Sequence, residues 1–178
     1  YGLYFGRVTE EKGVETVIKA YEKLPEYTVK IMGDDTTDEA KRLKKYVENH
    51  KMKNDEFLGF KSGAELENVI KGARFTLIPS IWYDNLPNTA LESFQYSKPV
   101  IASNIGSLPE LVIDGENGYL FKPSNVEDLI KKIKMLDDDT LVKKMGQASR
   151  KRLESRFAPQ THYEDLMKIF NEAVKSRK

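Results

Sequence analysis

Residues 79–95 read PSIWYDNLPNTALESFQ and follow an apolar run, residues 75–78, that predicts a buried strand. Apolar residues recur at helical spacing toward the end of the stretch, so a strand, a loop and a helix are expected in succession. Asn85 is the expected N-cap of this helix, and Pro87 suits its first turn. A strand that leads through a polar loop into a helix is typical of an α/β fold.

Polar groups gather on one face of the expected helix. Asn88 and Glu92 are four residues apart and share that face, with Thr89 close to it. Asp84 lies in the preceding loop. Two carboxylates, an amide and the unpaired backbone N–H groups of a helix N-terminus suit a polyhydroxylated, anionic ligand.

The composition is that of one folded domain. The 178 residues are 39% hydrophobic and 32% charged, enough for one domain with a core. The net charge of +1 does not indicate the basic surface that is typical of nucleic-acid-binding proteins. The absence of cysteine excludes disulfides and thiolate metal sites. No apolar run approaches the roughly 20 residues that span a bilayer, so a cytoplasmic protein is expected. Tyr1 already lies in an expected strand without an initiator Met, which suggests a piece of a longer protein.

Strands alternate with helices over most of the chain. The expected strands occupy residues 2–6, 27–32, 56–58, 74–78, 99–102 and 118–121. Capping boxes at Thr36–Glu39, Ser62–Glu65 and Ser124–Glu127 mark helix starts. This alternation predicts an α/β fold, a Rossmann-like doubly wound parallel sheet of about six strands with C-terminal helices.

Three helices are expected after residue 124, and the last begins after Pro159. That helix is expected to pack through a set of apolar residues: Tyr163, Leu166, Met167, Phe170 and Val174. The two histidines, His50 and His162, are expected at the surface, and nothing pairs them into a metal site. A basic run on the middle helix reads as a solvated face.

The fold class places distant loops side by side. A sheet in the order 3-2-1-4-5-6 brings the loop after strand 1, with Arg7 and Lys12, next to the loop that contains Asp84. Arg7 offers a planar fork of donors and Lys12 a mobile point charge, which together suit the oxygens of a diphosphate. Glu92, one turn deeper, suits vicinal hydroxyls such as those of a ribose.

Several motifs in one order give the chain a family resemblance: Gly6-Arg7, Glu11-Lys12-Gly13, Gly33, Leu58-Gly59-Phe60, the block PS…NLPN…LE within residues 79–92, and Gly106-Ser107-Leu108-Pro109-Glu110. Together they resemble the C-terminal, donor-binding domain of retaining glycosyltransferases with the GT-B fold, glycosyltransferase family 4. The resemblance spans residues 1–178 as one nucleotide-sugar-binding domain, with residues 159–178 as a helix that crosses back to an N-terminal domain not contained in this chain.

The resemblance implies roles for individual residues. Arg7 and Lys12 would bind the donor diphosphate and stabilise it as the leaving group, so that no metal or other cofactor is needed. The paired-Glu motif of the family matches Asp84 and Glu92. Asp84 would lie by the transferred sugar, although it is one methylene shorter than the usual Glu, and Glu92 would hold the ribose. Backbone groups of residues 58–60 would face the base. The implied substrate-binding residues are Gly6, Gly33, Leu58, Asn85, Leu86, Pro87, Asn88, Thr89 and Glu92.

The implied reaction is transfer of a sugar from a UDP-type or GDP-type donor to an acceptor hydroxyl with retained configuration. The acceptor, a saccharide or lipid-linked saccharide, would bind through the N-terminal domain, in bacterial or archaeal polysaccharide or glycolipid synthesis. Peripheral contact with the inner face of a membrane would suit such acceptors. The chain alone is expected to bind nucleotide but to turn over little, and its last helix to leave apolar surface exposed.

Two other functional classes stay open. A dehydrogenase or epimerase with a Rossmann fold is disfavoured because no G-x-G-x-x-G follows strand 1 and no phosphate-binding G-x-x-x-x-G-K-[ST] occurs. A non-catalytic module with the same fold would show no nucleotide affinity. Trp82 and Tyr83 suit a sugar platform as well as packing.

Overall fold

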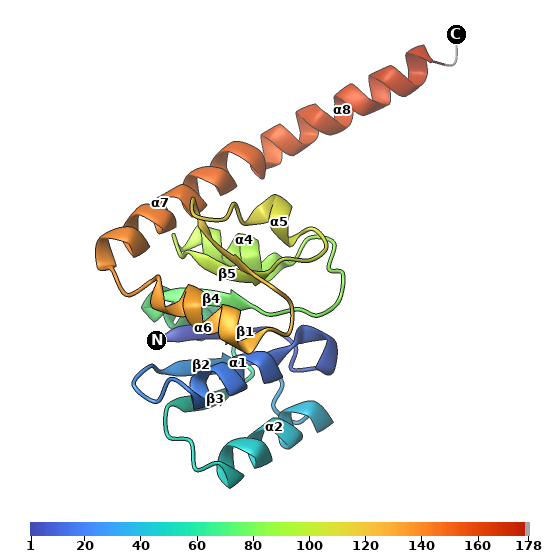
Figure 1. Cartoon of the computed structure of the whole chain (residues 1–178). Helices are drawn as coiled ribbons and strands as arrows, with labels where there is room; N and C mark the ends of the chain where they lie inside the picture. Colours follow the sequence, from blue (N-terminus) through green and yellow to red (C-terminus); the bar gives the residue numbers. More distant parts are fainter. Residues whose placement is uncertain (177–178) are drawn as a thin grey trace.

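Six short parallel strands form one sheet in the order β3-β2-β1-β4-β5-β6, as predicted (Figure 1). The computed structural model describes residues 1–176. The strands are β1 (Gly2–Phe5), β2 (Val29–Met32), β3 (Asp55–Gly59), β4 (Phe75–Ile78), β5 (Val100–Ser103) and β6 (Gly118–Phe121). Gly2 pairs in register with Val29 on one side and with Phe75 on the other. The chain therefore reverses its winding direction between β1 and β4.

Helices cover both faces of this sheet. They are η1 (Glu10–Lys12), α1 (Val14–Glu22), α2 (Asp38–Asn49), α3 (Gly63–Gly72), α4 (Asn88–Gln95), α5 (Leu108–Leu111), α6 (Val126–Lys134), α7 (Asp139–Arg156) and α8 (Pro159–Lys175). α1, α2 and α6 share one apolar core cluster, whereas α3, α4 and α5 pack in clusters on the opposite side. β1, β4 and β5 are buried throughout, which explains their continuous apolar sequences.

Two helices begin one residue later than their predicted caps. Thr37 caps α2, accepting a backbone hydrogen bond at 3.1 Å, while the hydroxyl of the predicted cap Thr36 donates to Asp34 instead. Asn125 caps α6 because Ser124 takes a left-handed conformation with φ 59°. The two predicted capping boxes at these sites are therefore wrong, and both errors arise where two capping residues are neighbours in the sequence.

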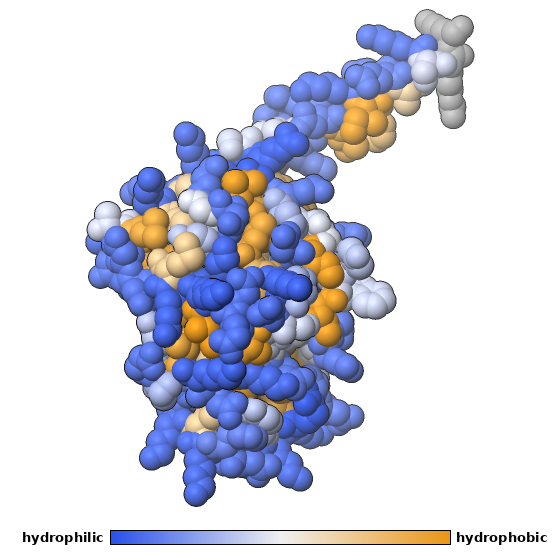
Figure 2. Space-filling view, in the orientation of Figure 1, coloured by the Kyte–Doolittle hydropathy of each residue, from blue (hydrophilic) through white to orange (hydrophobic). Residues whose placement is uncertain are grey.

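The last helix extends away from the domain. α7 packs against α4, but α8 projects beyond the sheet and its helices (Figure 1), and none of its described residues is buried. Apolar side chains on α8 are exposed (Figure 2): Tyr163, Leu166, Ile169, Phe170 and Val174. The prediction that this helix packs is therefore wrong for residues 1–176, whereas the predicted exposure of its apolar surface is confirmed. No helix among the described residues combines the length and apolar character needed to cross a membrane.

Candidate functional site

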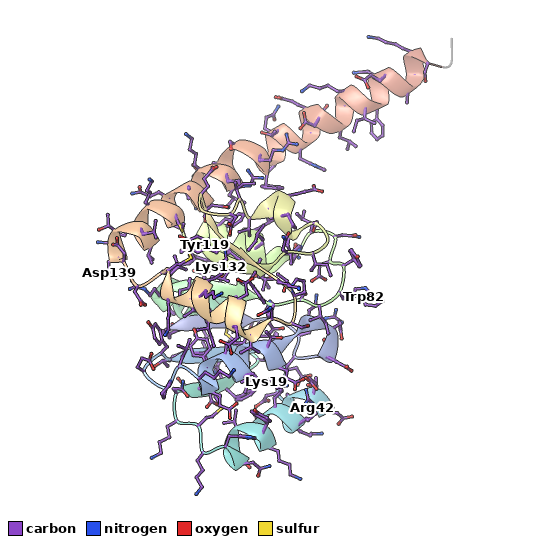
Figure 3. The ribbon with its side chains drawn as sticks, viewed as in Figure 1. Lys19, Arg42, Trp82, Tyr119, Lys132 and Asp139 are labelled. Atoms are coloured by element: carbon purple, nitrogen blue, oxygen red, sulfur yellow. The ribbon has the colours of Figure 1, made fainter. Side chains whose placement is uncertain are left out.

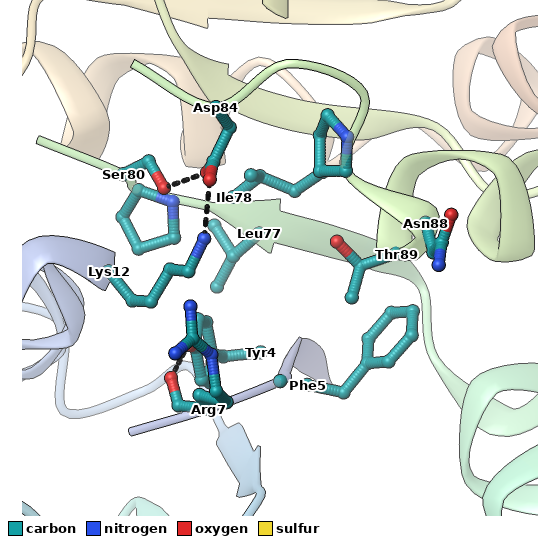
Figure 4. A pocket seen from close by; sticks show the side chains of 13 residues that line it. Tyr4, Phe5, Arg7, Lys12, Leu77, Ile78, Ser80, Asp84, Asn88 and Thr89 are labelled. Carbon is teal, nitrogen blue, oxygen red and sulfur yellow. Dashed lines mark hydrogen bonds and ion pairs between the residues drawn. The ribbon is translucent and has the colours of Figure 1, made fainter. Parts of the chain in front are cut away.

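Two adjoining hollows open at the carboxyl ends of β1 and β4. The first, the polar hollow of about 180 Å³, lies between η1, the loop after β4 and the start of α4 (Figure 4). The second, the wide hollow of about 560 Å³, extends from there across the ends of β1 and β2 toward α3. Phe5, Gly6, Arg7 and Thr89 line both hollows. Together they form one crevice at the point where the strand order reverses, the usual ligand position in such sheets.

The polar hollow brings Lys12 and Asp84 together from segments far apart in the chain. Lys12 Nζ lies 2.6 Å from Asp84 Oδ1, and the Ser80 hydroxyl donates to Asp84 Oδ2 at 2.6 Å (Figure 4). Burial alone would raise the pKa of Asp84, but the hydrogen bonds from Lys12 and Ser80 and the two nearby cations hold it below its usual value. The carboxylate therefore stays ionised and anchors Lys12 by a charge-assisted hydrogen bond.

Arg7 is the more exposed of the two cations in the crevice. Its side chain is 74% exposed, and an oxygen of its neighbour Glu11 lies 3.9 Å from the guanidinium. The Tyr4 hydroxyl donates to the backbone carbonyl of Arg7. Burial, reinforced by nearby carboxylates, raises the pKa of Tyr4, so this hydroxyl keeps its proton and remains a donor. The main chain at Arg7 is thus fixed while its guanidinium can reach toward a ligand.

The N-terminus of α4 opens on the polar hollow, with Asn88 and Thr89 in its first turn. Pro87, not Asn85, is the N-cap, and no side chain caps the helix. The predicted cap Asn85 is therefore wrong, because the extended loop continues for two more residues to Pro87. An uncapped first turn leaves backbone N–H groups and the positive end of the helix dipole available to an anion.

Two glycines at the ends of β1 and β2 shape the crevice. A Cβ on Gly33 would lie 2.0 Å from the carbonyl oxygen of Gly6. Gly6 itself has φ 144°, which side chains rarely adopt. Only glycine at these positions lets the strand ends approach so closely, as expected where backbone meets a ligand.

Glu92 lines the wide hollow from the second turn of α4. Burial is the one cause that raises the pKa of Glu92, and no hydrogen bond or ion pair from another described residue opposes it. A carboxylate without a protein partner at the wall of an open hollow can accept hydrogen bonds from a ligand hydroxyl.

Most predicted site residues converge on the crevice, and some do not. Those that line it are Gly6, Arg7, Lys12, Gly33, Asp84, Pro87, Asn88, Thr89 and Glu92. Asn85 and Leu86 instead line a separate hollow of about 410 Å³ beside Arg152. The Leu58 side chain packs into the apolar cluster under α3 rather than facing the crevice.

The wide hollow also contains side chains that were not predicted as site residues. Among them, Phe60, 75% exposed, and Lys61 line it after β3. Only the backbone of residues 58–60 was expected in this region. Gly59 is the residue in the sequence that could have indicated them. Its φ of 68° turns the chain at the end of β3, so that the next residue, Phe60, lies at the surface.

Trp82 and Tyr83 point away from the core at the tip of the loop after β4. Their exposed fractions are 65% and 72%, and Trp82 stands at the edge of the domain (Figure 3). Packing within residues 1–176 therefore does not explain these two aromatic rings. Among the same residues, no group of three or more histidine, aspartate or glutamate side chains is placed to hold a metal ion.

A parallel sheet with basic side chains and an open helix N-terminus at its switch point is an arrangement in which α/β domains bind phosphate groups. The family described as "Glycosyl transferases group 1" matches residues 1–152. The chain belongs to this family, which confirms the resemblance to GT-B glycosyltransferases, whereas membership of family 4 and retention of configuration stay predictions. Among curated relatives, an uncharacterized glycosyltransferase of Methanocaldococcus jannaschii is 32% identical over 97% of this chain. The chain spans about half, 48%, of the length of that relative.

Solved structures share the fold. The structure of Anabaena Alr3699/HepE in complex with UDP has a TM-score of 0.86 and 22% identity, over 96% of this chain and 48% of the other. A C-terminal domain of a glycosyl transferase group 1 family protein (LpcC) from Francisella tularensis has a TM-score of 0.77 and 26% identity. That match covers 89% of this chain and 87% of the other. The same arrangement thus occurs both within longer chains and as an isolated domain.

Proposed function

We propose that this chain is the donor-binding half of a glycosyltransferase that moves a sugar from a nucleoside diphosphate to an acceptor hydroxyl with retained anomeric configuration. The observation that carries the proposal is the convergence of Lys12, Arg7 and the open N-terminus of α4 on one hollow. These groups come from two segments far apart in the sequence, and all favour an anion. Family membership selects glycosyl transfer from the reactions that use such a site.

The polar hollow would take the diphosphate. Arg7 can form bidentate hydrogen bonds with phosphate oxygens, and Lys12 supplies a point charge from the same loop. The N–H groups of the first turn of α4 add partial positive charge. When the bond from the anomeric carbon to the terminal phosphate oxygen breaks, these fixed charges would stabilise the electron pair left on that oxygen. The protein groups can supply this charge without a metal or other cofactor.

The wide hollow would take the nucleoside. Glu92 would accept hydrogen bonds from the ribose hydroxyls, and the ring of Phe60 would contact the base at the mouth of the hollow. Its volume of about 560 Å³ lies in the range of small-molecule sites. UDP is the first candidate because a protein of the same fold, Alr3699/HepE, binds UDP and UDP-glucose in its structures.

The acceptor would bind outside this chain. Relatives of about twice this length supply a second half, against which the exposed apolar side of α8 could pack. A saccharide or lipid-linked saccharide acceptor, peripheral contact with the inner face of a membrane and a role in polysaccharide or glycolipid synthesis belong to the same proposal. Groups near Asp84 would determine which sugar, a hexose or another, the site accepts.

Calorimetric titration of the chain with UDP, GDP and ADP in EDTA tests the donor site. One nucleotide is expected to bind, and Arg7→Ala should weaken it about tenfold or more, since a charge-assisted hydrogen bond contributes about 1.5–3 kcal/mol. Lys143→Ala, a change at an exposed lysine on α7, is the matched control and should have no effect. Binding of no nucleotide, or equal effects of the two substitutions, would contradict the proposal.

A further inference from the structure

Both carboxylate oxygens and the backbone carbonyl of Asp84 accept hydrogen bonds. Its two carboxylate oxygens each lie 2.6 Å from a donor, Lys12 on one side and Ser80 on the other. Its backbone carbonyl accepts hydrogen bonds from the Ser107 hydroxyl at 2.8 Å and from the Ser107 N–H at 3.4 Å. Contacts with Lys12, Ser80 and Ser107 therefore fix the position of the carboxylate.

The segment that carries Lys12 is tied to the same loop. The N–H of Ile81 donates to the carbonyl of Glu11 at 3.0 Å, one residue before Lys12. Lys12 and Asp84 side chains are each only 20% exposed, so solvent screens their interaction weakly. The ion pair is thus built into the junction between η1 and the loop after β4.

This pair changes the charge balance of the crevice. Three basic side chains, Arg7, Lys12 and Lys61, and three acidic ones, Asp34, Asp84 and Glu92, line the crevice. A crevice that served only to bind a diphosphate as tightly as possible would leave Lys12 uncompensated. Lys12, less exposed than Arg7, instead has Asp84 as a counter-ion at 2.6 Å. Arg7 lies farther, 3.9 Å, from the nearest carboxylate, that of Glu11.

We propose that Asp84 has two effects in the crevice: it aims the ammonium group of Lys12, and its own charge weakens the site for the released nucleoside diphosphate relative to the nucleotide sugar. The inference rests on the proposed function. It replaces direct contact with the transferred sugar as the main role of Asp84.

The chemical reason is the charge that appears on transfer. In a nucleotide sugar each phosphate carries one negative charge. Once the sugar leaves, the terminal phosphate becomes a monoester-like group with a second pKa of about 6, so at neutral pH it carries close to one further charge. A carboxylate fixed beside Lys12 repels that added charge, whereas it tolerates the less charged donor. Release of the product is thereby favoured over retention.

Calorimetric titration separates this role from a sugar contact. Wild-type protein and Asp84→Asn would be titrated with UDP and UDP-glucose, and with GDP and GDP-mannose. Removing the charge is expected to lower the Kd for the nucleoside diphosphate about three- to tenfold and to change the Kd for the nucleotide sugar less. If Asp84 only bound the sugar, Asp84→Asn would weaken the nucleotide sugar and leave the nucleoside diphosphate unchanged, which would overturn the inference.

Two further variants control for a failure of Asp84→Asn to fold and for its change in net charge. Lys12→Gln removes the counter-ion of Asp84, so the carboxylate repels the ligand more strongly. The double variant Lys12→Gln/Asp84→Asn is therefore expected to bind nucleoside diphosphate more tightly than Lys12→Gln alone. Equal or weaker binding by the double variant would overturn the inference even if Asp84→Asn alone failed to fold. Glu48→Gln, which removes an exposed charge at the far end of α2, controls for net charge and should change no Kd.

Failure of the inference and failure of the proposed function give different results. Wild-type protein that binds no nucleotide would overturn the proposed function and this inference with it. Wild-type protein that binds nucleoside diphosphate, together with an Asp84→Asn variant of unchanged or higher Kd, would overturn the inference alone.

Discussion

Gly13 touches Pro79 so closely that the two loops of the crevice behave as one unit. A Cβ on Gly13 would lie 2.1 Å from the carbonyl oxygen of Pro79 and 3.1 Å from the Ile81 side chain. Gly13 has φ 66° and joins η1 to α1. This contact holds the loop after β1 against the loop after β4, and it is the reason that Lys12 meets Asp84.

Gly13→Ala is expected to damage both stability and the site. The left-handed backbone alone costs about 1 kcal/mol with alanine, and displacement of Pro79 should bring the loss to about 3 kcal/mol or more. Gly63→Ala is the matched control, since Gly63 has φ 54° but open space around its Cβ position, and it should show only the cost of the backbone conformation. Urea unfolding of both variants measures the difference, and equal losses would contradict the role of the Pro79 contact.

Asn54 should be one of the more sensitive polar positions away from the crevice. Its side-chain amide donates toward the carbonyls of Tyr21, Leu24 and Tyr27 at 2.8, 2.9 and 2.9 Å, which closes the C-terminal end of α1. Asn54→Ala is expected to lower the free energy of unfolding by about 2 kcal/mol because the hydrogen bonds from the amide to these carbonyls are lost. Asn68→Ala, at an exposed position on α3, should change it by less than about 0.5 kcal/mol.

The alternation of strands and helices could be predicted because the apolar pattern reveals it, whereas the order of the strands in the sheet was assumed from the fold class. Once the order is known, the carboxyl ends of β1 and β4 must be neighbours, and so must the loops that carry Lys12 and Asp84. Convergence of the main site residues therefore followed from topology. The direct contact of 2.6 Å did not, because it depends on loop conformations set by Gly13 and Ser107.

Other details depend on competition that a pattern does not resolve. Thr36 and Thr37 are chemically equivalent caps, and the side chain of Asp34 decides between them by accepting from Thr36. The apolar periodicity of α8 correctly gives its apolar side but does not say what lies against it. Asn85 failed as a cap for a similar reason, since either it or Pro87 could start α4.

Removal of residues 159–178 is expected to leave the domain folded. None of the described residues of α8 is buried, so little apolar area is lost from the core. The midpoint of thermal unfolding should shift by no more than about 2 °C. Sedimentation velocity should show less self-association than in the intact chain, because the exposed apolar side of α8 is gone. A large drop in the midpoint would show that α8 contributes to the fold.

Glu92 should reduce stability at neutral pH. Burial raises its pKa above the usual value, so between the unfolded pKa, near 4.5, and the raised folded value the folded state binds more protons. Stability attributable to this group is therefore lost as pH rises through that window. Glu92→Gln is expected to raise the midpoint of thermal unfolding at pH 7, and the difference from wild type should vanish near pH 4. Glu48→Gln, with an exposed side chain, should give no such pH-dependent gain.

The same substitution should weaken nucleotide binding while it stabilises the fold. An amide accepts hydrogen bonds from ribose hydroxyls less strongly than a carboxylate, because it carries no charge, and the expected loss of affinity is about tenfold. For the wild type, affinity should fall as pH drops through the raised pKa of Glu92 and the carboxylate becomes protonated. Titrations of both proteins with UDP-glucose, whose phosphates keep one charge each between pH 4.5 and pH 7.5, would show this fall only for the wild type. A parallel fall in Glu92→Gln would assign the pH dependence to another group and remove Glu92 from the ribose site.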